Sequence, residues 1–348
     1  MKITATAPMR VDLAGGTLDI YPLYVFEGGA YTINAAVGIR SRVVLETRND
    51  PKIIVYSRDL DMKLSAPNVD KLRPKGPLDL IARTVKYYRP TAGLTITTEN
   101  NIPKGSGLGA SSTLLMALSH ALIRLSGQRP DKEEVIDIGA NIEAQSIKVP
   151  TGKQDYYPAS YGGINAIWFG IDGVKRSSID VPGGFIQELE ERTVLSFVGA
   201  PRFSGATNWN MMKAYIDNQR RTVANMRRIK QTARKMKEVL EQGRFHALVR
   251  LLREEWQNRK NLAPGVTNPQ IDGIMAAIEK EGALASKLCG AGGGGCMVTL
   301  TRKGAKAGVE RYLQKAGILV LPFKIERRGA IVSSPAKPQR IRLTSALC

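Results

Sequence analysis

The chain has 348 residues, of which 43% are hydrophobic and 24% charged, a balance typical of a globular protein long enough for two domains. Its formal net charge of +20 favours an anionic partner such as nucleic acid, a membrane surface or a phosphorylated small molecule. The three cysteines are too few for a disulfide scaffold, and the two histidines make Ser-His-Asp hydrolases and histidine-rich metal sites poor candidates. The sequence shows no apolar leader and no apolar run long enough to span a membrane, so we expect a cytoplasmic protein.

The first half of the chain opens with strand patterns and continues with helices. Alternating or β-branched residues predict strands over 3–15, 31–39, 41–49, 52–59 and 93–100, with a helix over 78–88. Further helices are predicted over 110–127 and 131–147, followed by a loop over 151–163 and a strand over 163–170. An acidic first turn after Asp131 suits the start of the second of these helices.

After about residue 175 the pattern restarts. It predicts a strand over 192–200, helices over 212–243, 245–262, 269–282 and 310–317, a glycine-rich turn into a strand over 289–302, and a strand pair within 318–332. Strands and helices mix without strict βαβ alternation, which predicts an α+β protein with domains at 1–175 and 176–348. The tail from residue 333 fits either an ordered edge or a loose end.

Part of the positive charge lies in an Arg-rich helical stretch over 220–237. Apolar residues recur there at helical spacing: Val223, Met226, Ile229, Ala233, Met236 and Leu240. This pattern favours an amphipathic helix with a solvated basic face over a nucleic-acid-binding helix. Aromatic residues are not interleaved with the basic ones, and no zinc-finger, RRM or helix-turn-helix motif is present, so nucleic acid is not the expected partner.

The most informative segment is glycine-rich and runs into a helix pattern at residues 101–122. Gly105, Gly107 and Gly109 allow sharp turns and close approach of an anion, and the helix start points free N–H groups and its positive dipole end at that anion. A nucleotide phosphate is the leading interpretation, and a tight connection without a ligand is the alternative. The segment lacks the Walker A pattern, and its loose fit to a dinucleotide fingerprint follows a polar strand.

Polar residues gather at three further places. A strand with Arg10 and Asp12 leads into a turn over 15–17 and then Asp19, which either presents a carboxylate to a sugar hydroxyl or forms a capped β-turn. Glu143 lies on a predicted helix and either coordinates a metal or faces solvent. Asp155, beside a lysine in a Gly- and Tyr-rich loop, stays ionised and can accept a hydroxyl proton during phosphoryl transfer.

Three motifs together resemble the GHMP small-molecule kinases. They are APMRVDLAGGTLD at 7–19, PKGSGLGASSTL at 103–114 and KLCGAGGGGCMVTL at 287–300, in the order that the family has them. The second is similar to the family's P-x-x-x-G-L-G-S-S-A phosphate loop, with Ala110 in place of the first Ser. The third is similar to the family's C-terminal glycine-rich motif, and the three span nearly the whole chain.

This resemblance implies a two-domain fold, with an N-terminal domain like ribosomal protein S5 domain 2, a ferredoxin-like C-terminal domain and ATP between them. Asp155 stands at the catalytic aspartate and Arg10 at its basic partner. Mg²⁺ would be held by Ser111 or Ser112 together with Glu143. The phosphates would lie on Pro103, Gly105, Gly107, Leu108, Gly109, Ala110, Ser111 and Ser112.

The resemblance also implies a small-molecule acceptor. Asp19 aligns with the aspartate that sugar-specific members use, so a sugar or sugar phosphate is expected. Its candidate contacts are Gly16, Thr17, Asp19, Arg202, Ser204, Asn208, Gly292 and Gly293. The two glycines before Thr17 resemble the heptose 7-phosphate kinase and fucokinase-like branch, although that branch usually has a third glycine.

We therefore expect an ATP- and Mg²⁺-dependent sugar kinase that acts on an anomeric hydroxyl, with D-glycero-D-manno-heptose 7-phosphate as the first substrate. A galactose- or fucose-type 1-kinase is the alternative. A basic RNA-binding protein with an S5-like fold is the alternative from another class. The expected assembly is a monomer or a homodimer.

Overall fold

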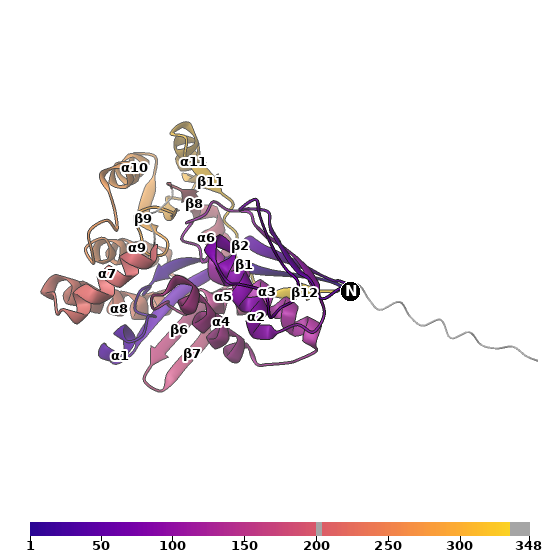
Figure 1. Ribbon diagram of the computed structural model, residues 1–348. Coiled ribbons are helices and arrows are strands. Elements are labelled where there is room, and N and C mark those ends of the chain that lie inside the picture. The colour runs from indigo at the N-terminus through magenta and orange to yellow at the C-terminus, as the bar shows by residue number, and fades with distance from the viewer. Residues whose placement is uncertain (200–203, 335–348) are drawn as a thin grey trace, which may run out of the picture.

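The computed structural model describes residues 1–199 and 204–334, which form one eight-stranded and one four-stranded sheet with helices around both (Figure 1). This mixed architecture confirms the α+β prediction. No helix in these ranges is both long and apolar enough to cross a bilayer. The predicted tail falls mostly at 335–348, outside the described residues.

Two long antiparallel strands form the centre of the large sheet. β1 (Lys2–Ala14) pairs with β2 (Ala30–Thr47) along its whole length, with register shifts after Pro8 and after Asp12. On the edge away from β1, the first half of β2 pairs with β6 and its second half pairs with β5, so the sheet divides into two branches along this edge. The remaining strands are β3 (Ile53–Ser57), β4 (Met62–Ala66), β5 (Leu94–Asn100), β6 (Ile164–Gly170), β7 (Gly173–Ser178) and β12 (Ile331–Ser333).

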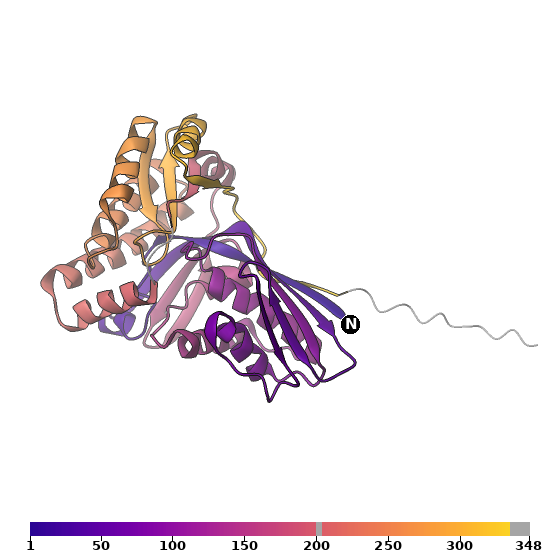
Figure 2. The same cartoon turned by 45° about the horizontal axis from the view of Figure 1, so that its top comes forward.

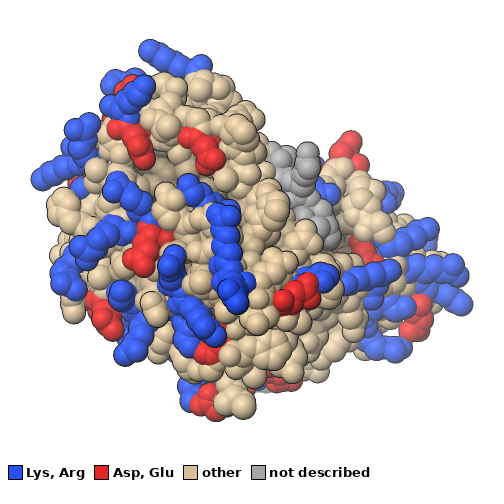
Figure 3. Space-filling model, turned by 90° about the vertical axis from the view of Figure 1, so that its left-hand side faces the viewer, with Lys and Arg blue, Asp and Glu red and all other residues tan. Residues whose placement is uncertain are grey.

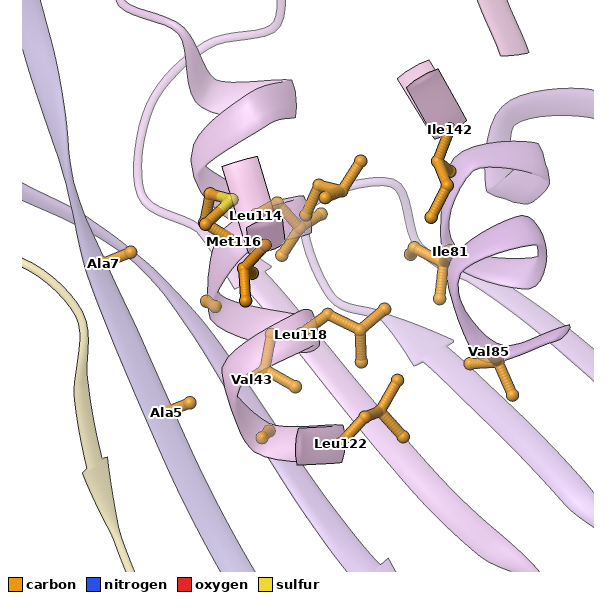
Figure 4. Packing of buried hydrophobic residues seen from close by; sticks show 14 of the residues in the cluster. Ala5, Ala7, Val43, Ile81, Val85, Leu114, Met116, Leu118, Leu122 and Ile142 are labelled. Atoms are coloured by element: carbon orange, nitrogen blue, oxygen red, sulfur yellow. The ribbon is translucent and has the colours of Figure 1, made fainter. Parts of the chain in front are cut away.

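Four α-helices cover one face of this sheet. They are α2 (Asp79–Tyr88), which follows the short 3₁₀ turn Gly76–Leu78, α3 (Ala110–Ser126), α4 (Lys132–Ile147) and α5 (Tyr156–Tyr161). Figure 4 shows Leu118 and Leu122 of α3 extending over the sheet towards Val85 of α2, with the small side chain of Ala5 on the other side of α3. Eleven of the 17 residues of α3 are buried, so the helix is held by burial on almost all sides, with only its ends near solvent.

The second sheet has the order β11-β8-β10-β9 and is antiparallel throughout. Its strands are β8 (Thr193–Phe197), β9 (Ala283–Leu288), β10 (Cys296–Thr301) and β11 (Leu319–Leu321). The helices of this part are α6 (Phe185–Arg192), α7 (Ser204–Ile216), α8 (Arg220–Glu241), α9 (Phe245–Arg259), α10 (Pro269–Lys280) and α11 (Lys306–Lys315), and a short α1 (Leu23–Phe26) follows β1.

One hydrophobic core joins the two sheets. Residues of β1 alternate between buried and half-buried up to Ala7, and from Ala7 to Ala14 every residue is buried. Met9 and Val11 pack in this region with Leu252 of α9. Figure 2 shows the second sheet with its helices, here called the second part, packed against the Ala7–Ala14 end of β1 and the adjoining end of β2. The strand therefore carries its polar residues Arg10 and Asp12 into the interior between the two parts.

The Arg-rich stretch forms the amphipathic helix expected from its pattern. Along α8, Met226, Ile229 and Met236 are fully buried, whereas Arg227 and Arg228 are exposed. Figure 3 shows Lys and Arg spread over this side of the molecule with Asp and Glu among them. The helix thus uses its apolar face for the core and leaves its basic face to solvent.

Several predicted elements differ from the structure. The loop predicted over 151–163 contains α5, a short helix held by the burial of Tyr156 and Tyr157. The helix predicted over 212–243 is divided into α7 and α8. The strand pair predicted within 318–332 is not a pair, because β11 joins β8 in the second sheet and β12 joins β1 in the first. These partners lie far away in the chain, so local patterns do not reveal them.

Two strands bear on where the chain divides into domains. β12 returns to the N-terminal sheet, and β7 (Gly173–Ser178) runs across residue 175. The boundary between domains at 1–175 and 176–348 stays a prediction.

Shortening Leu118 of α3 tests the core of the large sheet. Its side chain is 1% exposed, so Leu118→Ala should lower the free energy of unfolding by about 2–5 kcal/mol through lost burial and the cavity left behind. Urea unfolding followed by circular dichroism measures the loss. The control is Leu319→Ala, 49% exposed on β11, which should change the free energy by roughly 0.5 kcal/mol or less. Equal losses in the two variants would contradict this account of the core.

Candidate active site

The glycine loop lies between β5 and α3 and ends at the first turn of the helix. Gly105, Gly107 and Gly109 have φ angles of 78°, 72° and 75°, in the left-handed region that favours glycine. Gly109 is the N-cap of α3 and no side chain caps the helix, which leaves its first N–H groups available to an anion. The loop therefore has the backbone conformation that the sequence predicts for a phosphate site.

A second glycine-rich loop, over 289–295 between β9 and β10, supports the first. The carbonyl oxygen of Cys289 lies 2.4 Å from where a Cβ on Gly107 would stand, so only glycine fits there. The N–H of Cys296 donates to the carbonyl of Ser106 at 2.6 Å. The second sheet thus holds the first glycine loop through backbone contacts.

Two of the candidate substrate residues lie in this second loop. The N–H of Gly293 donates to the carbonyl of Val266 at 2.7 Å, and a Cβ on Gly292 would lie 2.6 Å from the same carbonyl oxygen. The structure therefore places both glycines against Val266, and their predicted contact with substrate stays a prediction.

Arg10 and Asp155 meet across 145 residues of chain. The Nε of Arg10 donates to Oδ1 of Asp155 at 2.8 Å, and Nη2 lies 2.6 Å from the same oxygen. Nη1 donates to the carbonyl of Gly107. Burial opposes the charge of Arg10, but attraction to Asp155 and Asp12 outweighs it and raises the arginine pKa further. The Arg10 guanidinium therefore contacts both the predicted catalytic carboxylate and the glycine loop.

Asp155 also touches the loop directly. It is the N-terminal boundary residue of α5, and its Oδ2 lies 2.9 Å from the position of a Cβ on Gly109. Its side chain keeps 21% of its surface exposed, whereas that of Arg10 keeps 4%. The Asp155 carboxylate is therefore accessible to solvent, while its partner Arg10 is buried.

The predicted metal carboxylate is buried one helix away. Oε2 of Glu143 on α4 accepts a hydrogen bond from Ser112 at 2.8 Å and another from the hydroxyl of Tyr156. Burial raises the pKa of Glu143 against the lowering effect of these donors. Among the described residues no Lys or Arg forms an ion pair with this carboxylate.

The donors at this place fit Mg²⁺. Carboxylate and hydroxyl oxygens are its preferred protein ligands, and phosphate oxygens and waters usually complete the shell. Ser111 is exposed and Ser112 is buried on Glu143, so the two predicted hydroxyl ligands differ in access. A cation bound here would supply the positive charge that Glu143 lacks within the protein.

Asp19 lies beside the segment that carries Asp155. It is 3% exposed, and its carboxylate accepts the N–H of Gln154 at 3.1 Å and the Nε2 of the same residue at 3.4 Å. Burial raises the pKa of Asp19 to about 6. A Cβ on Gly152 would lie 1.9 Å from its Oδ2, so a glycine is required there. The structure thus brings Asp19 and Asp155 to one site.

The other predicted residues are distributed around this site. Gly16 and Thr17 form the turn before Asp19, and both contact Arg259 of α9. Pro103 is half-buried before the glycine loop, and Leu108 is buried within it. Arg202 lies outside the described residues. Ser204 is the first residue of α7 and Asn208 is half-buried on the same helix.

Several residues at the site escaped the sequence interpretation. Gln154, Tyr156, Arg259 and Lys287 contact the predicted residues directly. Only Arg259 carries a local signal, an i,i+4 spacing from Glu255 on a helix. The other three depend on contacts between distant segments.

Comparisons with known proteins agree with this geometry. The family model for the GHMP kinases N terminal domain matches residues 79–163, and that for the GHMP kinases C terminal domain matches 236–319. A D-glycero-alpha-D-manno-heptose 7-phosphate kinase from Campylobacter jejuni is 29% identical over 94% of this chain and 97% of its own length.

Solved structures show the same similarity. A crystal structure of a D-glycero-D-manno-heptose 1-phosphate kinase from Bacteroides thetaiotaomicron superposes with a TM-score of 0.76 at 26% identity, covering 95% of this chain and 99% of that one. Lactococcus lactis galactokinase complexed with galactose shares the fold, with a TM-score of 0.75 at 17% identity over 95% of each chain. With both family models matched in order and similarity along nearly the whole chain, the protein belongs to the GHMP kinase family of ATP-dependent phosphotransferases.

Proposed function

We propose that this protein transfers the γ-phosphate of ATP to the anomeric hydroxyl of a sugar or sugar phosphate, with D-glycero-D-manno-heptose 7-phosphate as the first candidate. The observation that carries the proposal is the Arg10–Asp155 ion pair, which stands against the glycine loop at the start of α3. A carboxylate that can accept a hydroxyl proton is thereby next to a backbone site for phosphate. This pairing is what phosphoryl transfer to an alcohol requires.

On the nucleotide side, the loop N–H groups and the start of α3 bind the β and γ phosphates. Ser111 or Ser112 and Glu143 would hold Mg²⁺, which when bound neutralises charge on the transferring phosphate. Tyr156 and Ser112 fix the orientation of Glu143 by donating to its Oε2. Catalysis then depends mainly on positioning, because the transition state of phosphoryl transfer is loose.

On the acceptor side, Asp155 accepts the proton of the attacking hydroxyl. Arg10 keeps this carboxylate oriented and stabilises negative charge near the reacting oxygen. Asp19, with Gly16 and Thr17 before it, accepts hydrogen bonds from the sugar hydroxyls. The N–H of Gln154, the residue before Asp155, donates to Asp19 and so keeps the two carboxylates close together. The relative from Campylobacter jejuni supports a heptose phosphate as acceptor, and the net charge of +20 suits a phosphorylated substrate.

A substrate panel tests this function. Purified protein with Mg-ATP is given galactose, fucose, mannose, mannose 6-phosphate or heptose 7-phosphate, and ADP release is measured. We expect release with heptose 7-phosphate and a product phosphorylated at the anomeric oxygen by ³¹P NMR. Release with free galactose or fucose alone would support the alternative sugar 1-kinase instead. No release with any sugar would contradict an acceptor role for Asp19.

Asp155→Asn tests the proton acceptor. The amide keeps the shape of the carboxylate but cannot accept the proton, so kcat should fall by about 10²- to 10⁴-fold while ATP still binds. Steady-state kinetics and calorimetric titration with ATP measure the two properties. Asp172→Asn is the matched control, since Asp172 is exposed in the turn between β6 and β7 and pairs with Lys175 of β7. Normal kcat in a folded Asp155→Asn protein would refute the role.

The raised pKa of Asp19 predicts a pH dependence. Below about pH 6 the carboxyl is protonated and accepts hydrogen bonds from sugar hydroxyls less well. The kcat/KM for the sugar should therefore fall by about tenfold per pH unit below the pKa, and the kcat/KM for ATP at saturating sugar should not follow it. Asp19→Asn should lower the value at pH 7.5 and remove this inflection. An inflection that persists in that variant would assign it to another group.

A further inference from the structure

Four fully buried charges lie beneath the turn that precedes Asp19. They are Asp12 of β1, Glu255 and Arg259 of α9, and Lys287 of β9, and the side chain of each is 0% exposed. Buried charges are costly unless each is paired, so a cluster of this kind calls for a structural or functional reason. None of the four has a part in the phosphoryl transfer proposed above.

The cluster is balanced and joins the two parts of the molecule. The Nζ of Lys287 lies 3.0 Å from Oδ2 of Asp12 and donates to the carbonyl of the same residue at 2.7 Å. Nη2 of Arg259 lies 3.0 Å from Oε1 of Glu255 and 3.9 Å from Oδ2 of Asp12. Asp12 thus stands between two cations from the second part of the chain.

Arg259 also holds the turn itself. Its Nη2 donates to the carbonyl of Gly16 at 2.8 Å, and its Nη1 donates to Oγ1 of Thr17 at 3.4 Å. A Cβ on Gly16 would lie 3.0 Å from this Nη2 and 2.7 Å from Oδ2 of Asp12, so the turn sits directly on the cluster. The guanidinium therefore clamps two successive residues from below.

The conformation of Thr17 shows why a clamp is needed. Its φ is 73°, in the left-handed region, which is strained for a β-branched residue. Such a conformation persists only where the surroundings determine it, and such residues gather at functional sites. The contact with Arg259 and the burial of Thr17 at 5% exposure provide these surroundings.

The strained residue lies two positions before Asp19. Its conformation sets the direction in which the chain reaches Asp19, whose carboxylate is then held by Gln154, the neighbour of Asp155. A shift of the turn would displace Asp19 relative to Asp155. Displacements of this kind weaken substrate binding and catalysis steeply.

We propose that Arg259, oriented by Glu255, is a positioning residue for the acceptor sugar. It holds the Gly16–Thr17 turn with Thr17 in its left-handed conformation, while Lys287 ties the strand before that turn to the second sheet through Asp12. This inference rests on the proposed function, because it takes Asp19 to be the sugar-binding carboxylate. It assigns to the buried cluster a role in substrate geometry, beyond joining the two parts.

Arg259→Lys tests the clamp against a matched control. Lysine keeps the positive charge but cannot span Glu255, Gly16 and Thr17 together with its single ammonium group. Arg192→Lys is the control. Arg192 is a buried arginine of α6, 8% exposed, that pairs with Glu188 four residues earlier and donates to the carbonyl of Thr301. Both changes remove a buried guanidinium, and only the first removes it from beneath the turn.

Two measurements are compared in the wild type and both variants. In Arg259→Lys the KM for the sugar should rise about 10-fold or more with the KM for ATP within about threefold, because the lost contacts include charged hydrogen bonds to the turn. Hydrogen exchange of the amides at 14–20 should be about 10-fold faster, with that at 105–112 unchanged. In Arg192→Lys neither the sugar KM nor exchange at 14–20 should change.

Unchanged exchange at 14–20 in Arg259→Lys would overturn the proposal in favour of a purely structural cluster. The same conclusion would follow if the KM for the sugar and the KM for ATP rose equally, and did so in Arg259→Lys and Arg192→Lys alike. Glu255→Gln provides a second variant if Arg259→Lys fails to fold. It should change the same two readouts in the same direction, and no change would also overturn the proposal. The exchange measurement needs no sugar. If the wild-type protein phosphorylates none of the sugars, the proposed function is refuted, but the exchange measurement still decides whether Arg259 holds the turn.

Discussion

The ion pair between Arg10 and Asp155 is the interaction on which the site depends. It joins the central strand β1 to the start of α5, and Arg10 also donates to the carbonyl of Gly107 in the glycine loop. Because Arg10 is almost fully buried, its charge is costly without a carboxylate beside it. The pair therefore fixes the Asp155 carboxylate relative to the glycine loop. Under the proposed function these are the proton acceptor and the phosphate site, and their relative position is the main requirement of phosphoryl transfer.

The fold supplies this pair through one strand that passes between two layers. β1 has helices α3 and α5 on one side and α9 near its end, so residues after Ala7 are buried on both faces. Alternation along the strand then places Arg10 and Asp12 on the same face. Arg10 contacts Asp155 and the glycine loop, and Asp12 contacts the cations of the second part, so one strand connects the two regions that we propose bind nucleotide and sugar.

Much of this was visible in local patterns. The positive-φ glycines of the loop and the N-cap at Asp131, whose side chain accepts from the N–H of Glu134, follow from residue types at fixed spacing. The pairing of Arg10 with Asp155 was implied only by the family resemblance, since 145 residues separate them. The helix at Tyr156–Tyr161 and the return of β12 to the first sheet were missed, because both depend on packing against distant segments.

The sequence by itself determined the family, the mixed architecture and the backbone conformation of the glycine loop, because these depend on short motifs and on hydrophobic periodicity. Only the tertiary structure decided which residues surround the motifs. Arg259 and Lys287 reach the Gly16–Thr17 turn and Asp12 from more than 240 residues away, and no local pattern pairs them. Side-chain contacts between distant segments depend on how the layers pack, and packing is a property of the whole chain rather than of any one segment.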